Sequence, residues 1–99
     1  MKSQHQVILS IGSNQGNRLE NIERCLELIH QEIGTVIKVS RLYETPAWGF
    51  ESDAFYNCAL VLHTFSSAHK ILTQVLKIEK RLGRLRNKTK EYQSRTIDI

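Results

Sequence analysis

The residues best suited to chemistry concentrate in the last quarter of the chain. Eight Lys and Arg residues lie between Lys77 and Arg95 against only Glu79 and Glu91, which gives this segment a charge of +6 in a chain of net charge +4. Such a concentration is typical of a site for a polyanion, either a nucleotide polyphosphate or a nucleic-acid backbone. Asp98 follows three residues after Arg95 and offers the hard oxygen ligand that Mg²⁺ prefers. A solvated basic segment without a ligand is the alternative.

A second pair of residues is suited to holding a flat heterocycle. Phe55 and Asn57 stand two positions apart in a segment, 55–65, that we predict to be a strand, so their side chains project to the same face. An aromatic ring can stack on a heterocycle while the carboxamide offers one acceptor and two donors to its edge. The alternative is that Phe55 belongs to the core and Asn57 caps a loop.

A strand and a helix are expected in the first third of the chain. The apolar run Val7–Ile11, closed by Gly12, is typical of a buried strand. Asn17 is a good N-cap for the next helix, and Gly34 is expected to end it. The apolar face of this helix is predicted to comprise Leu19, Ile22, Leu26, Ile29 and Ile33. The glycine-rich turn over 12–17 could cradle a phosphate, but it lacks the Lys-Ser/Thr ending of a P-loop, so a plain strand-to-helix turn is the alternative.

The middle of the chain combines a strand with a long loop. The segment 35–43 is β-branched and alternating, which predicts a half-exposed strand with Ile37 and Val39 on one side. The segment 44–53 is the only long loop expected, and it carries the sole proline and the sole tryptophan, Trp48. Long loops in small domains are more often functional than not, although Trp48 could equally plug the edge of the core.

A second helix and a last strand complete the pattern. Ser67 is the expected N-cap of the second helix, and Gly83 is expected to end it. The apolar stripe of this helix is predicted to comprise Ile71, Leu72, Val75, Leu76, Ile78 and Leu82. Glu79 is unusual because no cation stands three or four positions away, so its carboxylate needs a tertiary or ligand partner. Thr96–Ile99 begins the last strand, with Thr96 and Asp98 on one face.

These elements predict an α+β fold. The order strand, helix, strand, strand, helix, strand is typical of a ferredoxin-like βαββαβ sandwich, with two helices on one face of an antiparallel sheet and the last strand truncated. A length of 99 residues predicts a single domain over 1–99. No apolar run approaches the ~20 residues of a membrane span and no signal segment precedes the first strand, so we expect a cytoplasmic protein. Cys25 and Cys58 are isolated and predicted to be buried, reduced thiols.

Five motifs that occur in order along the chain carry a family resemblance. They are Gly12-Ser13-Asn14 with Gly16-Asn17, then Tyr43-Glu44-Thr45-Pro46-Ala47-Trp48-Gly49, then Phe55-Tyr56-Asn57-Cys58-Ala59, then Ile78-Glu79 with Gly83-Arg84 and Arg86, and finally Arg95-Thr96-Ile97-Asp98. From Val7 onward the sequence resembles the 6-hydroxymethyl-7,8-dihydropterin pyrophosphokinases. That family transfers pyrophosphate from ATP to the hydroxymethyl group of the dihydropterin and releases AMP in folate biosynthesis.

The resemblance implies roles for individual residues. On the pterin side it implies substrate binding by Thr45, Pro46, Trp48, Phe55 and Asn57. On the ATP side it implies binding by Leu72, Glu79, Arg84, Arg86, Tyr92 and Arg95, with Glu79 accepting from a nucleotide hydroxyl and Tyr92 in the place of an aromatic that closes over the ligands. Arg84, Arg86, Arg95 and Asp98 would be catalytic, and Asp98 would be the metal ligand. The implied cofactors are two Mg²⁺ ions, with ATP as co-substrate, small molecules as the only partners, and no nucleic acid or membrane.

The resemblance also bears on the extent of the chain. Members of the family carry a second aspartate two residues after the position of Asp98, whereas this chain stops at Ile99. We therefore expect residues 1–99 to be the N-terminal portion of a pyrophosphokinase domain, inactive by itself. The competing class is a small basic ferredoxin-like module that binds nucleic acid, favoured by the +6 segment, although the strands lack the paired aromatics of an RNA-recognition motif. A ligand-sensing regulatory domain is a third class.

Overall fold

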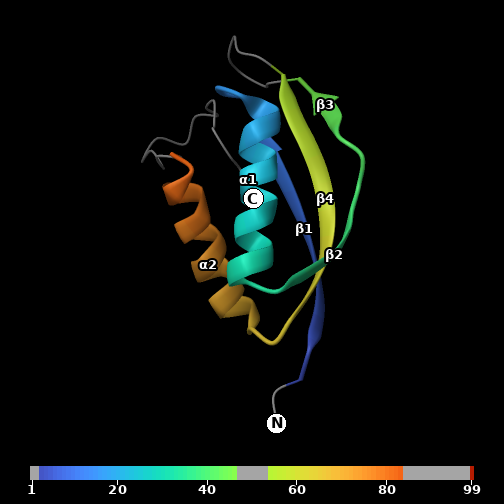
Figure 1. The fold of residues 1–99 in the computed structure, drawn as a ribbon, viewed down its shortest axis with the longest axis vertical. Helices are drawn as coiled ribbons and strands as arrows, with labels where there is room; N and C mark the ends of the chain where they lie inside the picture. The colour runs from blue at the N-terminus through green and yellow to red at the C-terminus, as the bar shows by residue number, and fades with distance from the viewer. Residues whose placement is uncertain (1–2, 47–53, 84–98) are drawn as a thin grey trace.

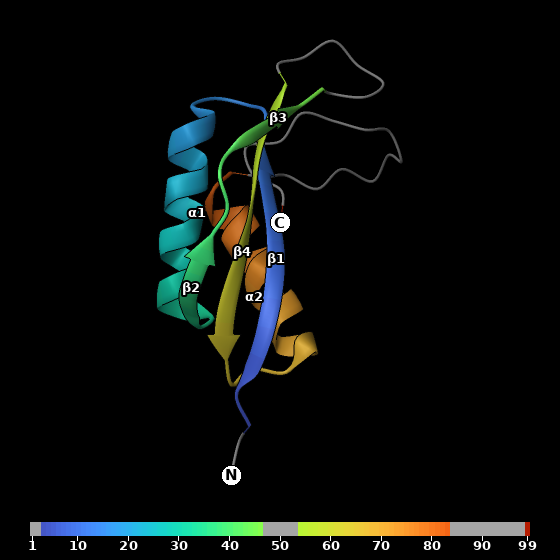
Figure 2. The ribbon, with the colours of Figure 1, turned by 90° about the vertical axis from the view of Figure 1, so that its right-hand side faces the viewer.

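A computed structural model describes residues 3–46, 54–83 and 99, and within these residues the chain forms four strands and two helices. In chain order they are β1 (His5–Ser13), α1 (Arg18–Glu32), β2 (Thr35–Val39), β3 (Tyr43–Thr45), β4 (Phe55–Thr64) and α2 (Ala68–Arg81). The strands form one antiparallel sheet, and both helices lie on the same face of it (Figures 1 and 2). The predicted α+β class is confirmed, and the predicted last strand lies outside the described residues except for Ile99.

The sheet is built around β4. β1 pairs with β4 along its whole length, from His5 opposite Thr64 to Ser13 opposite Tyr56. The other edge of β4 is shared, because β2 pairs with its C-terminal half and β3 pairs with its first three residues. The start of β4 therefore lies between the end of β1 and β3. This arrangement brings three separate segments of the chain together at one end of the sheet.

The segment 35–43, predicted as one strand, is divided in the structure. β2 ends at Val39, and β3 begins at Tyr43 and includes two residues that were assigned to the long loop, Glu44 and Thr45. A bulge between Val36 and Lys38 breaks the alternation of β2. Ile37 and Val39 are 49% and 44% exposed, so this strand contributes neither of them to the core.

The helix boundaries follow the predicted capping residues. The Asn17 side chain accepts a hydrogen bond from the backbone N–H of Glu20 at 3.1 Å, and Ser67 accepts one from Lys70 at 3.2 Å. Gly83 ends α2 with a φ of 95°, a conformation that favours glycine. Gly34 follows α1 as predicted, but its φ is not positive; its lack of a side chain is needed because a Cβ there would overlap the backbone carbonyl of His63.

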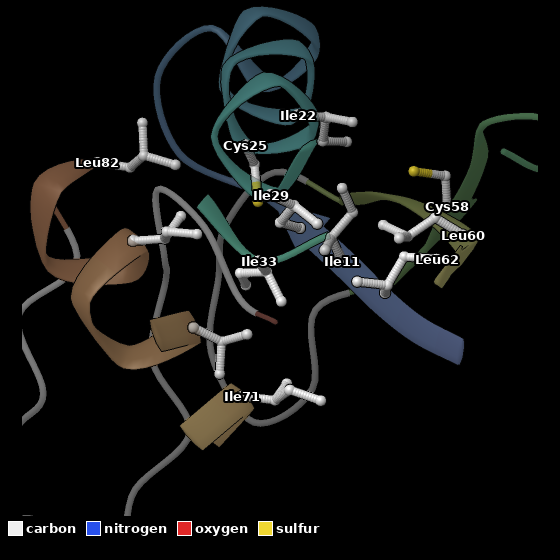
Figure 3. Packing of buried hydrophobic residues seen from close by; sticks show 12 residues of the cluster. Ile11, Ile22, Cys25, Ile29, Ile33, Cys58, Leu60, Leu62, Ile71 and Leu82 are labelled. Atoms are coloured by element: carbon white, nitrogen blue, oxygen red, sulfur yellow. The ribbon is translucent and has the colours of Figure 1, made fainter. Parts of the chain in front are cut away.

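One apolar core fills the space between the helices and the sheet (Figure 3). Its buried members are Ile11, Ile22, Cys25, Ile29, Ile33, Cys58, Leu60, Leu62, Ile71, Val75, Ile78 and Leu82. Three residues predicted on the apolar faces of the helices are instead exposed: Leu19 at 45%, Leu72 at 56% and Leu76 at 37%. In α2 the buried side chains lie along one side of the helix that includes Ile71 and Ile78. Successive residues are rotated by about 100° around the helix axis, so Leu72 and Leu76 lie at the border of this buried side.

Both cysteines are free and buried, as predicted. Burial, with smaller effects of the neighbouring Cys58 and Glu79, raises the pKa of the Cys25 thiol from 9.0 to about 12. Burial also raises the pKa of Cys58. Neither helix in the described ranges 3–46 and 54–83 has the length and apolar character that a membrane crossing requires.

Candidate functional site

The face of the sheet opposite the helices carries a group of five residues at the start of β4. Side chains alternate along β4. Those of Cys58, Leu60 and Leu62 belong to the core, and those of Phe55 and Asn57 project from the opposite face of the sheet. The strand register places Gly12 and Tyr43 on either side of Asn57, and Thr45 beside Phe55. We call Gly12, Tyr43, Thr45, Phe55 and Asn57 the open-face cluster.

The carboxamide of Asn57 is held by its neighbours in this cluster. Its Nδ2 donates to the Thr45 hydroxyl at 2.8 Å and lies at 3.4 Å from the Phe55 carbonyl oxygen and 3.5 Å from that of Tyr43. Its Oδ1 lies over Gly12, where a Cβ would approach it to 2.7 Å. Gly12 therefore provides the room in which the amide sits, and the Thr45 hydroxyl sets its orientation.

The ring of Phe55 lies beside this amide. Its Cδ1 is 3.4 Å from the position that a Cβ on Gly12 would take, so the ring covers the backbone of β1 at that point. Phe55 is one of the buried apolar residues, although it does not belong to the cluster beneath the helices, and Asn57 lies within a strand and not at a loop. The core interpretation of Phe55 therefore stays open, whereas the loop-cap interpretation of Asn57 is wrong. Phe55 is 4% exposed, so a ligand can stack on its ring only after a local rearrangement.

The remaining predicted pterin residues lie at the end of β3 or beyond it. Thr45 is half-buried and Pro46 is exposed. Trp48 lies outside the described residues. The structure thus brings Thr45, Phe55 and Asn57 together. Phe55 and Asn57 share one face of the strand, as predicted from their spacing.

The predicted ATP side is represented by two residues of α2. Leu72 is 56% exposed, whereas Glu79, two turns further along the helix, is 2% exposed. A carboxylate oxygen of Glu79 accepts a hydrogen bond from the backbone N–H of Ile99 at 3.2 Å, which provides a tertiary partner of the kind the sequence required. The other predicted members, Arg84, Arg86, Tyr92, Arg95 and Asp98, lie outside the described residues.

Within residues 3–46, 54–83 and 99 no group of three or more His, Cys, Asp and Glu side chains is arranged to hold a metal ion. The glycine-rich turn before α1 is closed by a side chain of that helix: Asn21 donates to the Ser13 hydroxyl at 3.2 Å and to the Gln15 carbonyl at 2.9 Å. Ser13 and Asn14 are buried. These contacts favour a plain strand-to-helix turn over a phosphate cradle.

Two residues near the site were not found from the sequence. Gly12 was interpreted as the end of a strand, as part of the glycine-rich turn and as part of a family motif, but not as a neighbour of Asn57, because that contact depends on the register between two distant segments. Arg18 donates from Nη1 to the Ala54 carbonyl at 2.8 Å, and its guanidinium carbon lies 3.9 Å from the centre of the Tyr56 ring. The only sequence signal for Arg18 is a cation at the first position of a helix, where positive charge is unfavourable.

Residues 8–99 match the family model described as 7,8-dihydro-6-hydroxymethylpterin-pyrophosphokinase. A 2-amino-4-hydroxy-6-hydroxymethyldihydropteridine pyrophosphokinase of Porphyromonas gingivalis is 38% identical over 95 residues, which cover 94% of this chain and 65% of the relative. Its counterpart in Aquifex aeolicus is 35% identical over 94 residues, covering 94% of this chain and 57% of the relative. A folate synthesis bifunctional protein of Arabidopsis thaliana is 35% identical over 95 residues, covering 95% of this chain and 19% of the relative. The chain therefore spans less than two thirds of the length of each of these three relatives.

Proposed function

We propose that this chain, which belongs to the 7,8-dihydro-6-hydroxymethylpterin-pyrophosphokinase family, is part of an enzyme that transfers pyrophosphate from ATP to 6-hydroxymethyl-7,8-dihydropterin. The products are the pterin pyrophosphate and AMP, and the reaction belongs to folate biosynthesis. Residues 1–99 supply the N-terminal portion of a single pyrophosphokinase domain with a ferredoxin-like βαββαβ sandwich. The four-stranded antiparallel sheet with two helices on one face supports that fold.

The open-face cluster is the observation that carries this proposal. A pterin is flat and presents hydrogen-bond donors and acceptors along its edge. Phe55 supplies a stacking surface, and Asn57 supplies an amide held in one orientation by the Thr45 hydroxyl. Pro46 follows Thr45 directly, and with Trp48 it completes the proposed pterin side.

The ATP side rests on the family resemblance together with α2. Leu72 is exposed on α2 and available to the adenosine moiety. Arg84, Arg86 and Arg95 neutralise the phosphates, and Tyr92 covers them. Pyrophosphoryl transfer requires positioning and neutralisation of charge more than a covalent nucleophile, and these residue types provide both.

Mg²⁺ is the proposed metal, with Asp98 as a ligand. A carboxylate suits this hard cation, which completes its coordination with phosphate oxygens and water. The backbone N–H of Ile99, the residue that follows Asp98 in the sequence, donates to the carboxylate of Glu79. When bound, the two expected Mg²⁺ ions neutralise charge on the transferring phosphates.

The experiment that tests this function is AMP formation from ATP, 6-hydroxymethyl-7,8-dihydropterin and Mg²⁺ by the full-length protein. Phe55→Ala should weaken pterin binding about tenfold or more, because loss of a stacking contact costs ~1–3 kcal/mol on the scale known for bases. Asn57→Ala should have an effect of the same order, because it removes hydrogen bonds to the pterin edge. Nucleotide binding should change little.

The matched control is Ile8→Ala on the same face of β1, a residue that is 69% exposed and stands four positions from Gly12. It should retain full activity. Absence of AMP formation by the unaltered protein, or pterin affinity unchanged in both cluster variants, would exclude the proposal. Binding of nucleic acid that falls steeply with salt and needs no Mg²⁺ would instead support the alternative suggested by the +6 segment.

A further inference from the structure

Arg18 makes two contacts that its position in the helix does not explain. It is the first residue of α1, where the aligned backbone dipoles make a positive charge unfavourable. Its side chain is nevertheless half-buried and reaches Ala54, 36 residues away in sequence and directly before β4. A local role in the helix therefore does not account for a cation at this position, and a tertiary role does.

The two contacts of Arg18 lie on either side of Phe55. One guanidinium nitrogen donates to the Ala54 carbonyl at 2.8 Å, and the guanidinium carbon lies 3.9 Å from the Tyr56 ring centre. An arginine stacked on an aromatic ring while donating a hydrogen bond is fixed in both distance and orientation. Arg18 thus joins the first turn of α1 to the backbone immediately before and after Phe55.

The start of β4 is also where strand pairing ends. The register of β4 begins at Phe55 opposite Thr45 and at Tyr56 opposite Ser13, so Ala54 lies beyond the last pair in both ladders. Figure 1 shows the first turn of α1 at the same end of the molecule as this strand start. The Ala54 carbonyl therefore takes its described partner from α1, and Arg18 extends the fixed part of β4 by one residue.

We infer that Arg18 is a positioning residue for the pterin side: through Ala54 and Tyr56 it fixes the start of β4 from the helical face, and so fixes Phe55 and Asn57 on the open face. The inference rests on the proposed function. Side chains on a strand alternate, so a clamp on Tyr56 from one face sets the direction of both its neighbours on the other. A small shift of a stacking ring and its adjacent amide is enough to lower affinity for a flat ligand.

The test compares binding of 6-hydroxymethyl-7,8-dihydropterin with binding of a non-hydrolysable ATP analogue in the full-length protein. Pterin affinity is measured with the analogue and Mg²⁺ at saturation. We expect Arg18→Gln to weaken pterin binding about tenfold, equivalent to about 1.4 kcal/mol, with nucleotide affinity changed less than twofold. Arg18→Lys, which keeps the cation over Tyr56, should recover most of the loss. Arg24→Gln, which removes an exposed arginine from the same helix, should bind both ligands normally.

A second readout separates this inference from the proposed function. Amide hydrogen exchange at Phe55 and Tyr56 should become faster in Arg18→Gln, while the exchange of Leu60 and Leu62 stays unchanged. If the unaltered protein bound no pterin, the proposed function would fail, and the exchange result would still decide whether Arg18 fixes the strand start.

Three outcomes would overturn the inference. The first is pterin affinity within twofold of the unaltered protein in Arg18→Gln, and the second is unchanged exchange at Phe55 and Tyr56. The third is an equal loss of pterin and nucleotide affinity together with a lower melting temperature, which would indicate general destabilisation. Should Arg18→Gln fail to fold, Tyr56→Leu, which removes the ring beneath the guanidinium, is judged by the same criteria.

Discussion

Replacing Gly12 with alanine tests the open-face cluster without removing any of its polar groups. The new Cβ would stand 2.7 Å from Asn57 Oδ1 and 3.4 Å from Phe55 Cδ1. The amide must rotate away, and its 2.8 Å hydrogen bond to Thr45 is lost or lengthened. A half-buried hydrogen bond contributes ~0.5–1.5 kcal/mol, whereas Gly to Ala within a strand gains ~0.5–1 kcal/mol. The free energy of unfolding should therefore change by less than about 1 kcal/mol.

Pterin binding should respond much more strongly to the same change. The displaced amide no longer faces the ligand edge, and we expect a loss of about tenfold in pterin affinity, or about 1.4 kcal/mol. Calorimetric titration with 6-hydroxymethyl-7,8-dihydropterin, with an ATP analogue present, measures the affinity, and urea denaturation measures the stability. Gly12→Ala with normal pterin affinity would refute the role assigned to the cluster.

Gly34→Ala provides the matched comparison. There the new Cβ would meet the backbone carbonyl of His63, which cannot rotate away as a side chain can. We expect this variant to lose about 1–3 kcal/mol of stability, the range for overpacking, while any folded fraction binds pterin normally. Equal destabilisation by the two alanines would contradict the distinction drawn between them.

Two further predictions concern the basic segment and the buried thiols. Arg86→Ala and Arg95→Ala should each slow pyrophosphoryl transfer more than tenfold, where each factor of ten corresponds to about 1.4 kcal/mol. Lys88→Ala should leave turnover unchanged. Normal turnover in both arginine variants would mean that the basic segment is only solvated charge. At pH 8 Cys25 should react with a thiol reagent far more slowly in the native than in the unfolded protein, because burial shields the thiol and raises its pKa from 9.0 to about 12. The sign of this shift means that native stability falls as the pH rises from about 9 towards 12, and Cys25→Val should flatten that dependence in thermal melts.

The features predicted correctly from the sequence depend on local rules. Asn17 and Ser67 cap helices through their own backbone neighbours, and Gly83 adopts a left-handed conformation that few other residues tolerate. The shared face of Phe55 and Asn57 follows from alternation within a single strand. Each of these statements needs only a few consecutive residues, so no knowledge of the tertiary fold was required.

The features that were missed depend on tertiary packing between segments that are distant in the sequence. Leu72 carries the same apolar character as Ile71, but its exposure is set by the direction from which α2 meets the core. Glycine is needed at position 34 because a Cβ would meet the backbone of His63, and at position 12 because a Cβ would meet the side chain of Asn57. His63 and Asn57 both lie in β4, which pairs with the other strands only after the chain has folded back. The bulge in β2 likewise reflects pairing with β4. A single sequence contains no register between distant strands, so these contacts could not be derived from it.

Glu79 has two interpretations that one experiment separates. The family resemblance implies that its carboxylate accepts from a nucleotide hydroxyl, whereas the structure shows it buried and accepting from the Ile99 N–H at 3.2 Å. If it contacts a ribose hydroxyl, the unaltered protein should prefer ATP over 2′-deoxy-ATP or 3′-deoxy-ATP, and Glu79→Gln should reduce that preference. If it only anchors the chain at Ile99, Glu79→Gln should lower the affinity for all three nucleotides by the same factor, because the amide oxygen is a weaker acceptor than a carboxylate. Lys77→Gln, an exposed position two residues away on α2, is the control. We expect the uniform loss, and a preference for ATP that disappears only in Glu79→Gln would show that the anchoring interpretation is wrong.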